Sequence, residues 1–386
     1  MVIHLLRAVS ILTVITASYS IAVYIHQSNE RKSYEKFFLD EEKTAIEILK
    51  SKKDQDNPQL DQNQKRIKVL VIEGGGAKGL YALRVLDYLE KKTGKPISEL
   101  YDVMAGTSIG SLLVSLLSVP NTDRKPKYTA EEVLKVFGKV AKKTLLPSWG
   151  HNFLSAYGLL SPLLNNQNFI KELQNVCGNI LFSEALNHLV LFGYDFNTTK
   201  IIGFHNRGKN LEFANPLLYQ LIGGTTAPFG ISALNKIILS PLYSAQFIGD
   251  AAMVLNNPLA PTMVDLQRLY PDKKFLVTYI VIAPKELEDT INFPFYSGWI
   301  KAVGMFKPLM ITAQNQLIRE SMDSLARVYK FDLLLEIGLY QNMEWTRINS
   351  FDFSEKNLKK IDDFSKMTLS HNKEALDAVA IELLKD

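Results

Sequence analysis

The sequence of 386 residues predicts an α/β fold, a sheet flanked by helices. Two segments, residues 67–92 and 101–119, favour this fold. Each begins with a short apolar run of strand length, continues through a glycine-rich turn, and ends in a stretch whose apolar positions fit a helix. Strands that alternate with helices in this way are typical of a sheet covered by helices.

The turn of the first segment reads Gly74-Gly75-Gly76-Ala-Lys78-Gly79. Consecutive glycines between a strand and a helix leave several backbone N–H groups uncovered and pointing one way, which suits an oxyanion. We expect an oxyanion hole in this loop, with Gly75 and Gly76 as the main donors and Gly74 beside them. Lys78 either adds a positive field there or is an ordinary solvated lysine at a helix start.

The same glycines also satisfy the dinucleotide-binding pattern G-x-G-x-x-G, through Gly74, Gly76 and Gly79. That function needs an acidic residue at the end of a second strand, about 20 residues further on. Glu99 is near enough in sequence, but it precedes the strand. A nucleotide-binding oxidoreductase is therefore a less favoured alternative. A phosphate-binding P-loop is weaker still, since no Gly-Lys-Ser/Thr follows.

The turn of the second segment, Gly106-Thr-Ser108-Ile-Gly110, fits the nucleophile elbow G-x-S-x-G. In this motif a serine on a tight strand-to-helix turn presents its hydroxyl above the sheet. Gly106 and Gly110 lack a Cβ, so the strand and the helix can pack closely. Ser108 lies at the helix N-terminus, where free N–H groups favour a developing negative charge. Patterns this short also occur in ordinary tight turns.

A third segment, Phe247-Ile-Gly-Asp250-Ala-Ala-Met-Val-Leu-Asn-Asn-Pro258, brings an apolar run to an aspartate and then to a turn. Together the three segments resemble the patatin-like phospholipase family. That family carries a glycine-rich oxyanion loop, G-x-S-x-G, and Asp-Gly-Gly or Asp-Gly-Ala followed by Asn-Pro. The resemblance includes residues 192–195 and 225–228, and it covers most of residues 67–386.

The resemblance implies a three-layer α/β/α fold with a central, mostly parallel sheet. It also implies a lipid acyl hydrolase of the phospholipase A or lysophospholipase type, which needs no cofactor. Ser108 would be the nucleophile and Asp250 the base of a Ser-Asp dyad, with an acyl-enzyme intermediate. The expected partner is a membrane lipid or phospholipid, and transfer of the acyl group to an alcohol instead of water stays open.

Two positions depart from the family pattern. Glu73 stands where the family commonly has aspartate, which keeps the charge. Ala251 stands where it usually has the glycine that follows the catalytic aspartate. If that position needs a positive φ, alanine costs about 1 kcal/mol and displaces Asp250. A catalytically silent, membrane-tethered lipid-binding protein is therefore an alternative.

A Ser-His-Asp triad competes with the dyad, because an aspartate of ordinary pKa about 4 is a weak base at neutral pH. The order Ser108, Asp250, His371 matches that of α/β-hydrolase triads. His371, however, precedes a predicted C-terminal helix, where a cap or a surface histidine is more common. His188 and His205 flank predicted strands, and we expect structural roles for both.

The amino end contains an uncharged run of 18 residues, Ala8–Ile25. It is close to the roughly 20 residues that span a bilayer. We expect residues 1–28 to form a hydrophobic helix that anchors the chain in a membrane, with two alternatives. A cleaved signal peptide would make the protein secreted, and a buried helix would place the run in the core.

Residues 29–65 are expected to form a charged, exposed helix over residues 30–50 and a solvated linker. The catalytic domain then covers residues 66–386, with its core motifs within 67–262. Residues 144–164 and 293–310 mix aromatic residues with Gly and Pro, as a cover over a substrate site would, although core packing explains them equally.

The composition, 47% hydrophobic and 22% charged, agrees with a packed enzyme. A net charge of +4, without a basic tract that interleaves aromatics, argues against nucleic acid. The single cysteine, Cys177, excludes an intrachain disulfide. Neither zinc-ligand nor calcium-ligand spacing is present in the sequence, so we predict no metal.

Overall fold

The computed structural model describes most of the chain. The described residues are 2–52, 66–146, 149–155, 161–162, 164, 166–207, 215–229, 231–239, 246–282, 321–328, 331–337 and 348–385. The predicted linker therefore lies outside the described residues for most of its length, and so does the predicted cover over residues 293–310.

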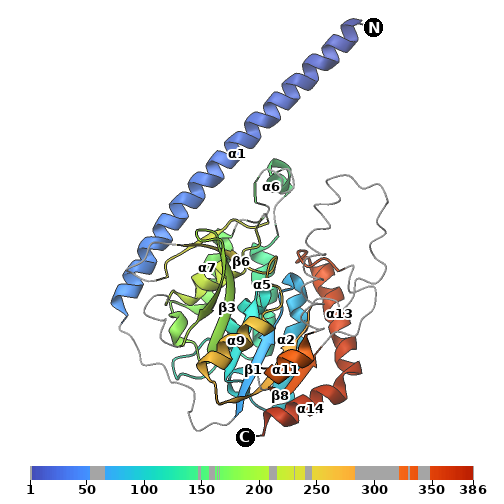
Figure 1. Cartoon of the computed structure of the whole chain (residues 1–386). Helices are drawn as coiled ribbons and strands as arrows, with labels where there is room; N and C mark the ends of the chain where they lie inside the picture. Colours follow the sequence, from blue (N-terminus) through green and yellow to red (C-terminus); the bar gives the residue numbers. More distant parts are fainter. Residues whose placement is uncertain are drawn as a thin grey trace.

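Eight strands of the described residues form a sheet at the centre of the structure (Figure 1). The strand order is β5-β6-β3-β2-β1-β7-β8, and β4 pairs with β3. The pairs β1/β2, β2/β3, β1/β7 and β7/β8 are parallel, and those that join β3 to β4 and β6, and β5 to β6, are antiparallel. The strands are β1 (Arg66–Ile72), β2 (Val103–Thr107), β3 (His188–Asp195), β4 (Lys200–His205), β5 (Asn235–Ile237), β6 (Gln246–Asp250), β7 (Lys274–Ile280) and β8 (Phe331–Ile337).

Helices cover both faces of this sheet, which confirms the predicted layers. Alternate residues of a strand point to opposite faces, and β1 shows this clearly. Leu70 and Ile72 join a large apolar cluster, whereas Val69 and Val71 join a smaller one. The large cluster contains residues of α2 (Gly79–Thr93), α4 (Ile109–Leu117), α5 (Ala130–Thr144), α7 (Gln167–Cys177), α8 (Leu218–Thr225), α13 (Glu355–His371) and α14 (Lys373–Leu383). The smaller one contains residues of α9 (Leu259–Leu269), with α11 (Met322–Val328) packed against it.

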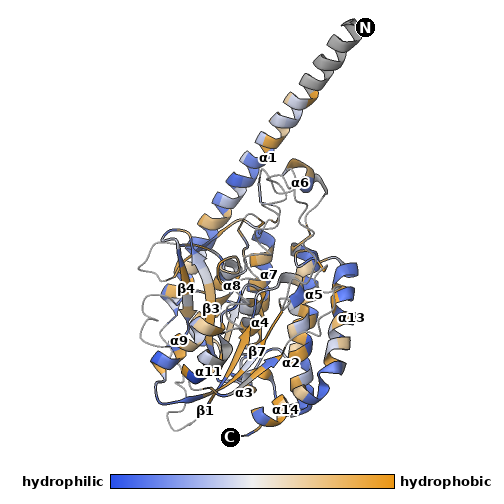
Figure 2. Cartoon of the chain, turned by 45° about the vertical axis from the view of Figure 1, so that its right-hand side comes forward, coloured by the Kyte–Doolittle hydropathy of each residue, from blue (hydrophilic) through white to orange (hydrophobic). Residues whose placement is uncertain are grey.

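The buried central strands are coloured hydrophobic in Figure 2, and the helices carry hydrophilic residues as well. Both predicted strand-turn-helix segments are confirmed. The first is β1, a short 3-10 helix at Gly76–Lys78, and α2, and the second is β2 followed by α4. The remaining short helices are α3 (Ile97–Leu100), α6 (Trp149–Leu154) and a 3-10 turn at Phe182–Glu184.

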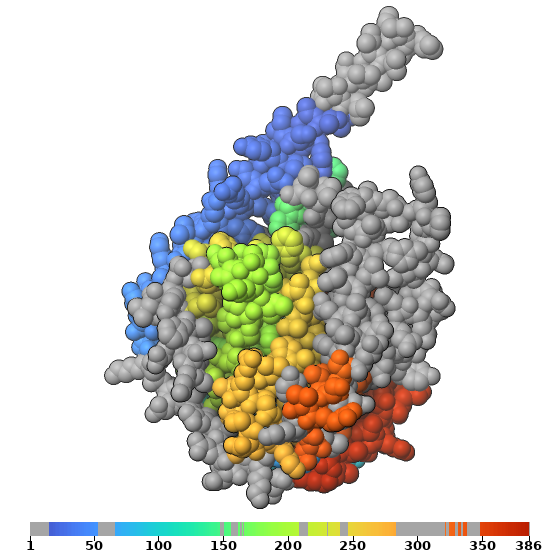
Figure 3. Space-filling model, in the orientation of Figure 1, coloured from blue at the N-terminus to red at the C-terminus, as the bar shows by residue number. Residues whose placement is uncertain are grey.

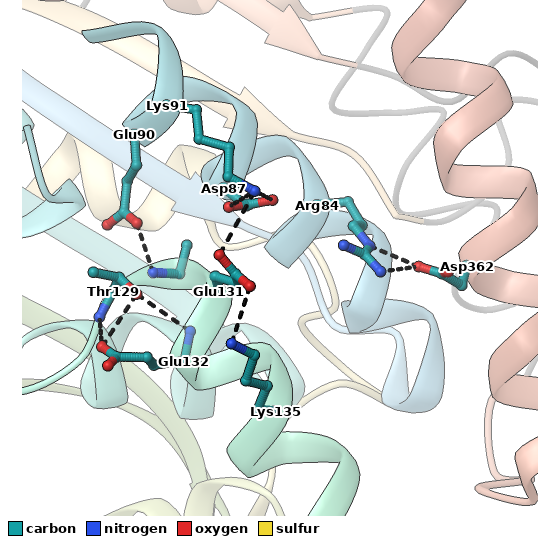
Figure 4. A network of polar contacts seen from close by, with 10 residues as sticks. Arg84, Asp87, Glu90, Lys91, Thr129, Glu131, Glu132, Lys135 and Asp362 are labelled. Carbon is teal, nitrogen blue, oxygen red and sulfur yellow. Dashed lines mark hydrogen bonds and ion pairs between the residues drawn. The ribbon is translucent and has the colours of Figure 1, made fainter. Parts of the chain in front are cut away.

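Polar contacts hold α2 to its neighbours in the outer helical layer (Figure 4). The Glu90 carboxylate of α2 accepts from the N–H of Ala130, the first residue of α5, at 2.7 Å. Arg84 pairs with Asp362 of α13 at 2.6 Å. Thr129 and Glu132 form a capping box that begins α5. These contacts fix the helices that carry one side of the candidate site.

The amino-terminal helix α1 is continuous over Val2–Ser51; its amino-terminal end projects away from the sheet domain, and its second half lies along the domain (Figure 1). Its second half was expected to be exposed, and that expectation is wrong in part. Phe37, Ala45 and Leu49 are buried in the large apolar cluster. Glu41 accepts a hydrogen bond from the Tyr219 hydroxyl at 2.8 Å. Some charged residues of this half, such as Arg31 and Glu35, are exposed, whereas Glu41 and Glu42 bond to residues of the domain.

A membrane-spanning helix was expected in residues 1–28. Among the helices of the described residues, none is long and apolar enough to cross a bilayer.

Candidate active site

The strand register brings Ser108 and Asp250 together. The last paired residue of β2, Thr107, lies opposite Phe192 of β3. The next residue of β3, Gly193, pairs with Asp250, the last residue of β6. Strand β6 thus takes up the edge of β3 at the point where β2 turns into α4. The residue that follows Thr107 must therefore lie beside Asp250, although 142 positions separate them in the chain.

Ser108 occupies a strained backbone conformation, with φ 55° and ψ −124°. A positive φ is uncommon for residues other than glycine and marks functional turns. The glycines beside it make the turn possible. A Cβ on Gly106 would lie 2.3 Å from the Gly110 carbonyl carbon, and one on Gly110 would lie 2.3 Å from the Ile72 oxygen. The predicted elbow is therefore a tight turn that packs against β1.

The Ser108 Oγ donates a hydrogen bond to Asp250 Oδ2 at 2.5 Å. The other carboxylate oxygen, Oδ1, accepts from the Ala252 N–H at 2.8 Å, and the Asp250 N–H donates to the Ala227 carbonyl at 2.9 Å. Asp250 is 7% exposed. Its carboxylate is held from both sides, with one oxygen directed at the serine hydroxyl.

The glycine loop approaches this pair from β1. A Cβ on Gly74 would lie 3.2 Å from the Ser108 Cβ. The Gly74 N–H donates to the Asn256 carbonyl at 3.1 Å, so the expected role of Gly74 as an oxyanion donor is wrong in this geometry. Within the described part of the chain, the N–H groups of Gly75 and Gly76 have no acceptor. These two groups are available for an oxyanion.

Gly76 has φ +56°, and a Cβ there would lie 2.2 Å from the Ser350 carbonyl oxygen. That oxygen accepts from the Ala77 N–H at 2.8 Å. The loop is thus clamped against the chain segment before α13. Gly79 allows α2 to pack closely against the elbow helix α4, because a Cβ there would lie 2.4 Å from Ile109 Cγ1.

Two charged residues flank the loop inside the protein. Glu73 is fully buried, and its carboxylate accepts from the Tyr279 hydroxyl and from the Ile282 N–H. Lys78 is 6% exposed, so the solvated alternative for this lysine is wrong. Burial disfavours the charged ammonium and lowers the pKa of Lys78 to about 8.

Ala251 fits its position without strain. Among the described residues, those other than glycine with a positive φ are Ser108, Arg124 and Thr199, and Ala251 is not one of them. Its side chain is fully buried in the smaller apolar cluster. The backbone here does not require glycine, so alanine beside Asp250 gives no structural ground for inactivity.

The three histidines lie apart from the serine. His371 is exposed at the end of α13, with Nδ1 2.9 Å from the Met367 carbonyl of the same helix. His188 Nε2 lies 3.3 Å from His205 Nδ1, and His205 Nε2 lies 3.2 Å from the Asp265 carboxylate of α9. The described geometry therefore assembles a serine with an aspartate and no triad through His371.

An apolar pocket of about 790 Å³, including the part open to solvent, begins at Ser108 and Gly76. Its walls come from helices of the large apolar cluster. They include Leu112 and Leu116 of α4, Phe137 and Val140 of α5, and Phe169 and Leu173 of α7. Sequence reasoning missed these residues, because apolar positions at helical spacing look the same whether they face a core or a pocket.

Leu145 and Leu164, at the two ends of the predicted cover over residues 144–164, also line the pocket. Part of that prediction falls on residues outside the described set. Asn166 lines the pocket as well, although its side chain amide donates to the carbonyl of Ala233 at 2.6 Å. The pocket is therefore mostly apolar, with the serine among its lining residues.

Comparison with known proteins shows a similarity to one family. A family model for patatin-like phospholipase matches residues 70–232. Relatives from Solanum tuberosum include Patatin-2-Kuras 3 and Probable inactive patatin-3-Kuras 1, each 26% identical to this chain over 170 residues. Each match covers 42% of this chain, and it covers 42% of the first relative and 43% of the second. Patatin-17 from Solanum cardiophyllum is 26% identical over 145 residues, 36% of each chain. The chain thus spans less than half of the length of these curated relatives.

Proposed function

We propose, from the match of residues 70–232 to the patatin-like phospholipase family, that the protein is a lipid acyl hydrolase of the phospholipase A or lysophospholipase type. Ser108 is its nucleophile, Asp250 its base, and Gly75 and Gly76 its oxyanion donors. The observation that carries the proposal is the Ser108 hydroxyl, which is hydrogen-bonded to Asp250 and belongs to a residue that lines an apolar pocket. The pocket offers a place for an acyl chain beside the reacting oxygen.

In the first step Ser108 Oγ attacks the ester carbonyl carbon while its proton moves to Asp250 Oδ2. The carbonyl oxygen becomes the oxyanion, which accepts from the Gly75 and Gly76 N–H groups. Such donors contribute about 3 kcal/mol each to the transition state. The tetrahedral intermediate then expels the alcohol, which takes the proton from Asp250, and an acyl-serine remains.

In the second step Asp250 takes a proton from water, whose oxygen attacks the acyl-serine. Collapse of this second intermediate returns the proton to Ser108 and releases the fatty acid. An aspartate is a weak base compared with histidine. Three features support its action here: its direct hydrogen bond to Ser108, its low exposure and the two oxyanion donors.

The apolar walls suit a long acyl chain. Each methylene group transferred from water to such a wall contributes about 0.8 kcal/mol. Ile109, Leu112 and Leu116 follow one another along the face of α4 that starts at the nucleophile. A chain that lies along them places its ester carbonyl at Ser108.

We also propose association with lipid surfaces through the first half of α1. Ile21, Tyr24 and Ile25 lie within about one turn on that helix and are 51–72% exposed. Apolar residues so exposed on a helix favour interfacial binding. The full chain should float with phospholipid vesicles, and replacement of the three residues with serine should abolish flotation. Flotation that survives the replacement would exclude this surface.

Hydrolysis of lysophospholipid and of a series of nitrophenyl esters tests the proposal. The wild type should hydrolyse both, and Ser108→Ala and Asp250→Asn should lose at least about 10²-fold in kcat/KM. His371→Gln is the matched control and should keep full activity. Equal losses of kcat/KM in His371→Gln and Ser108→Ala would exclude a mechanism that uses the Ser-Asp dyad alone. A wild type that binds lipid without turnover would favour a silent lipid-binding protein, as the name of one relative suggests for that relative.

A further inference from the structure

Three potential metal ligands meet where α1 passes α6. His26 and Glu30 lie one helical turn apart on α1, and His151 lies on α6. His26 Nε2 is 3.6 Å from Glu30 Oε2, and His151 Nδ1 is 3.3 Å from Glu30 Oε1. One ligand atom from each residue lies within 4.8 Å of the others. The two helices are side by side in Figures 1 and 3, although the residues are far apart in the sequence.

The hydrogen bonding of His151 determines which of its nitrogens can bind an ion. Nε2 lies 2.9 Å from the carbonyl oxygen of Pro162. A carbonyl only accepts, so Nε2 carries the hydrogen in this contact. Nδ1 then directs either a lone pair or a second proton toward the Glu30 carboxylate. A cation between the two groups would satisfy both, and a ligating histidine commonly has its other nitrogen bound to a carbonyl in this way.

His26 points to the same place. Its Nε2 atom is buried and, within the described part of the chain, lacks a hydrogen-bond partner. The side chains of His26 and Glu30 are each 20% exposed, and that of His151 is 14% exposed. Two imidazoles and a carboxylate thus converge in a partly enclosed space. A cation in this space would accept a lone pair from each of the three groups.

We propose that His26, Glu30 and His151 bind a zinc ion that clips α1 to α6. Zinc takes histidine nitrogen and carboxylate oxygen at about 2.0–2.2 Å in a tetrahedron, so its ligand atoms lie about 3.3–3.6 Å apart. The separations of 3.3 and 3.6 Å are of this size, each to a different oxygen of the Glu30 carboxylate, and one ligand atom from each of the three residues lies within 4.8 Å of the others. Water supplies the fourth ligand. Magnesium and calcium prefer sites made of oxygen, so two imidazoles disfavour them.

The clip goes beyond the proposed hydrolysis, because it concerns the cover of the pocket. His151 contacts Pro162, and Leu164 and Asn166, which follow, line the pocket. From α1, the Tyr34 hydroxyl donates to Asn166 Oδ1 at 3.1 Å. Zinc would add a second, stronger attachment between α1 and this segment. The sequence could not reveal the site, because 121 residues separate His151 from Glu30 and no zinc motif spaces them.

The test measures zinc binding by the full chain. Purified protein is stripped with a chelator and titrated with Zn²⁺ against a chromophoric competitor, and Co²⁺ is added separately for its absorption spectrum. The wild type should bind one zinc and give an intense spectrum typical of tetrahedral cobalt. His26→Gln and His151→Gln should each weaken zinc binding more than about 10- to 100-fold. Loss of a group that only hydrogen-bonds to a metal ligand already weakens binding by that factor.

Two controls separate the site from general surface binding. Glu35→Gln removes an exposed carboxylate of the same helix, 57% exposed and paired with Arg31, and should leave zinc affinity unchanged. His371→Gln removes an exposed histidine and should do likewise. The circular dichroism and Tm of all metal-free variants confirm folding. Wild-type affinity equal to that of His26→Gln and His151→Gln overturns the proposal and leaves His151 and Glu30 as neighbours without a metal.

Discussion

Replacement of Gly76 with alanine tests the oxyanion loop at its most constrained position. Gly76 has φ +56°, a left-handed conformation that costs about 1–2 kcal/mol for other residues. The new Cβ would also lie 2.2 Å from the Ser350 carbonyl oxygen, so the loop or its neighbour must move. Movement takes the Gly76 N–H away from the oxyanion. Loss of one such donor costs about 10²–10³-fold in kcat, or about 2.7–4 kcal/mol.

Gly94→Ala is the matched control. Gly94 ends α2 with φ +70°, but a Cβ there would meet nothing within 4 Å. The Gly94→Ala variant should therefore lose about 1 kcal/mol in the free energy of unfolding and keep the wild-type kcat. The assay is hydrolysis of a short-chain nitrophenyl ester, with urea unfolding of each variant. A folded Gly76→Ala enzyme within fivefold of wild-type kcat would refute the loop as the oxyanion hole.

Three further predictions concern the surroundings of the site. Lys78→Met should raise the free energy of unfolding at pH 7 by about 3 kcal/mol, because the folded-state pKa of Lys78 is lowered from 10.5 to about 8. The wild type gains stability between pH 8 and 10.5, because over this range only the unfolded chain keeps the proton on Lys78. Urea unfolding at pH 10.5 should therefore show a much smaller difference in the free energy of unfolding between Lys78→Met and the wild type than at pH 7. Leu116 lies about 12 Å along α4 from Ser108. Leu116→Phe should lower kcat/KM for long-chain esters about 15-fold, as expected if two methylene groups of the acyl chain are excluded from the pocket. Equal loss for short-chain esters would indicate misfolding instead. Ala251→Gly should cost about 1 kcal/mol in stability without raising kcat, and a tenfold gain in kcat would show that alanine displaces Asp250.

Local patterns predicted the parts of the fold that local chemistry determines. The glycine loop and the elbow each combine a strand, a turn that only small residues allow, and a helix, so their positions follow from neighbouring residues. The close approaches at Gly106 and Gly110 show why glycine is needed there. Asp250 required the family resemblance, because its place beside Ser108 depends on how β6 pairs with β3.

Other features could not be predicted from local patterns, because they arise from contacts between distant segments. The docking of α1 depends on partners such as Tyr219 and Asn166, which follow more than 100 residues later. The occupied N–H of Gly74 depends on the Asn256 carbonyl. The pocket walls depend on how α4, α5 and α7 are placed relative to one another. The conformation at Ala251 also required coordinates, since an alanine there is compatible with several backbone geometries.

Covalent labelling of Ser108 tests the central claim most directly. The full chain is treated with a fluorophosphonate, which forms a stable phosphonyl ester with an activated serine, and the modified peptide is identified by mass spectrometry. We predict one modification, on Ser108, that is absent in Ser108→Ala and at least about 10²-fold slower in Asp250→Asn. A wild type that stays unmodified, or that is modified on another serine, contradicts the assignment of Ser108 as the nucleophile.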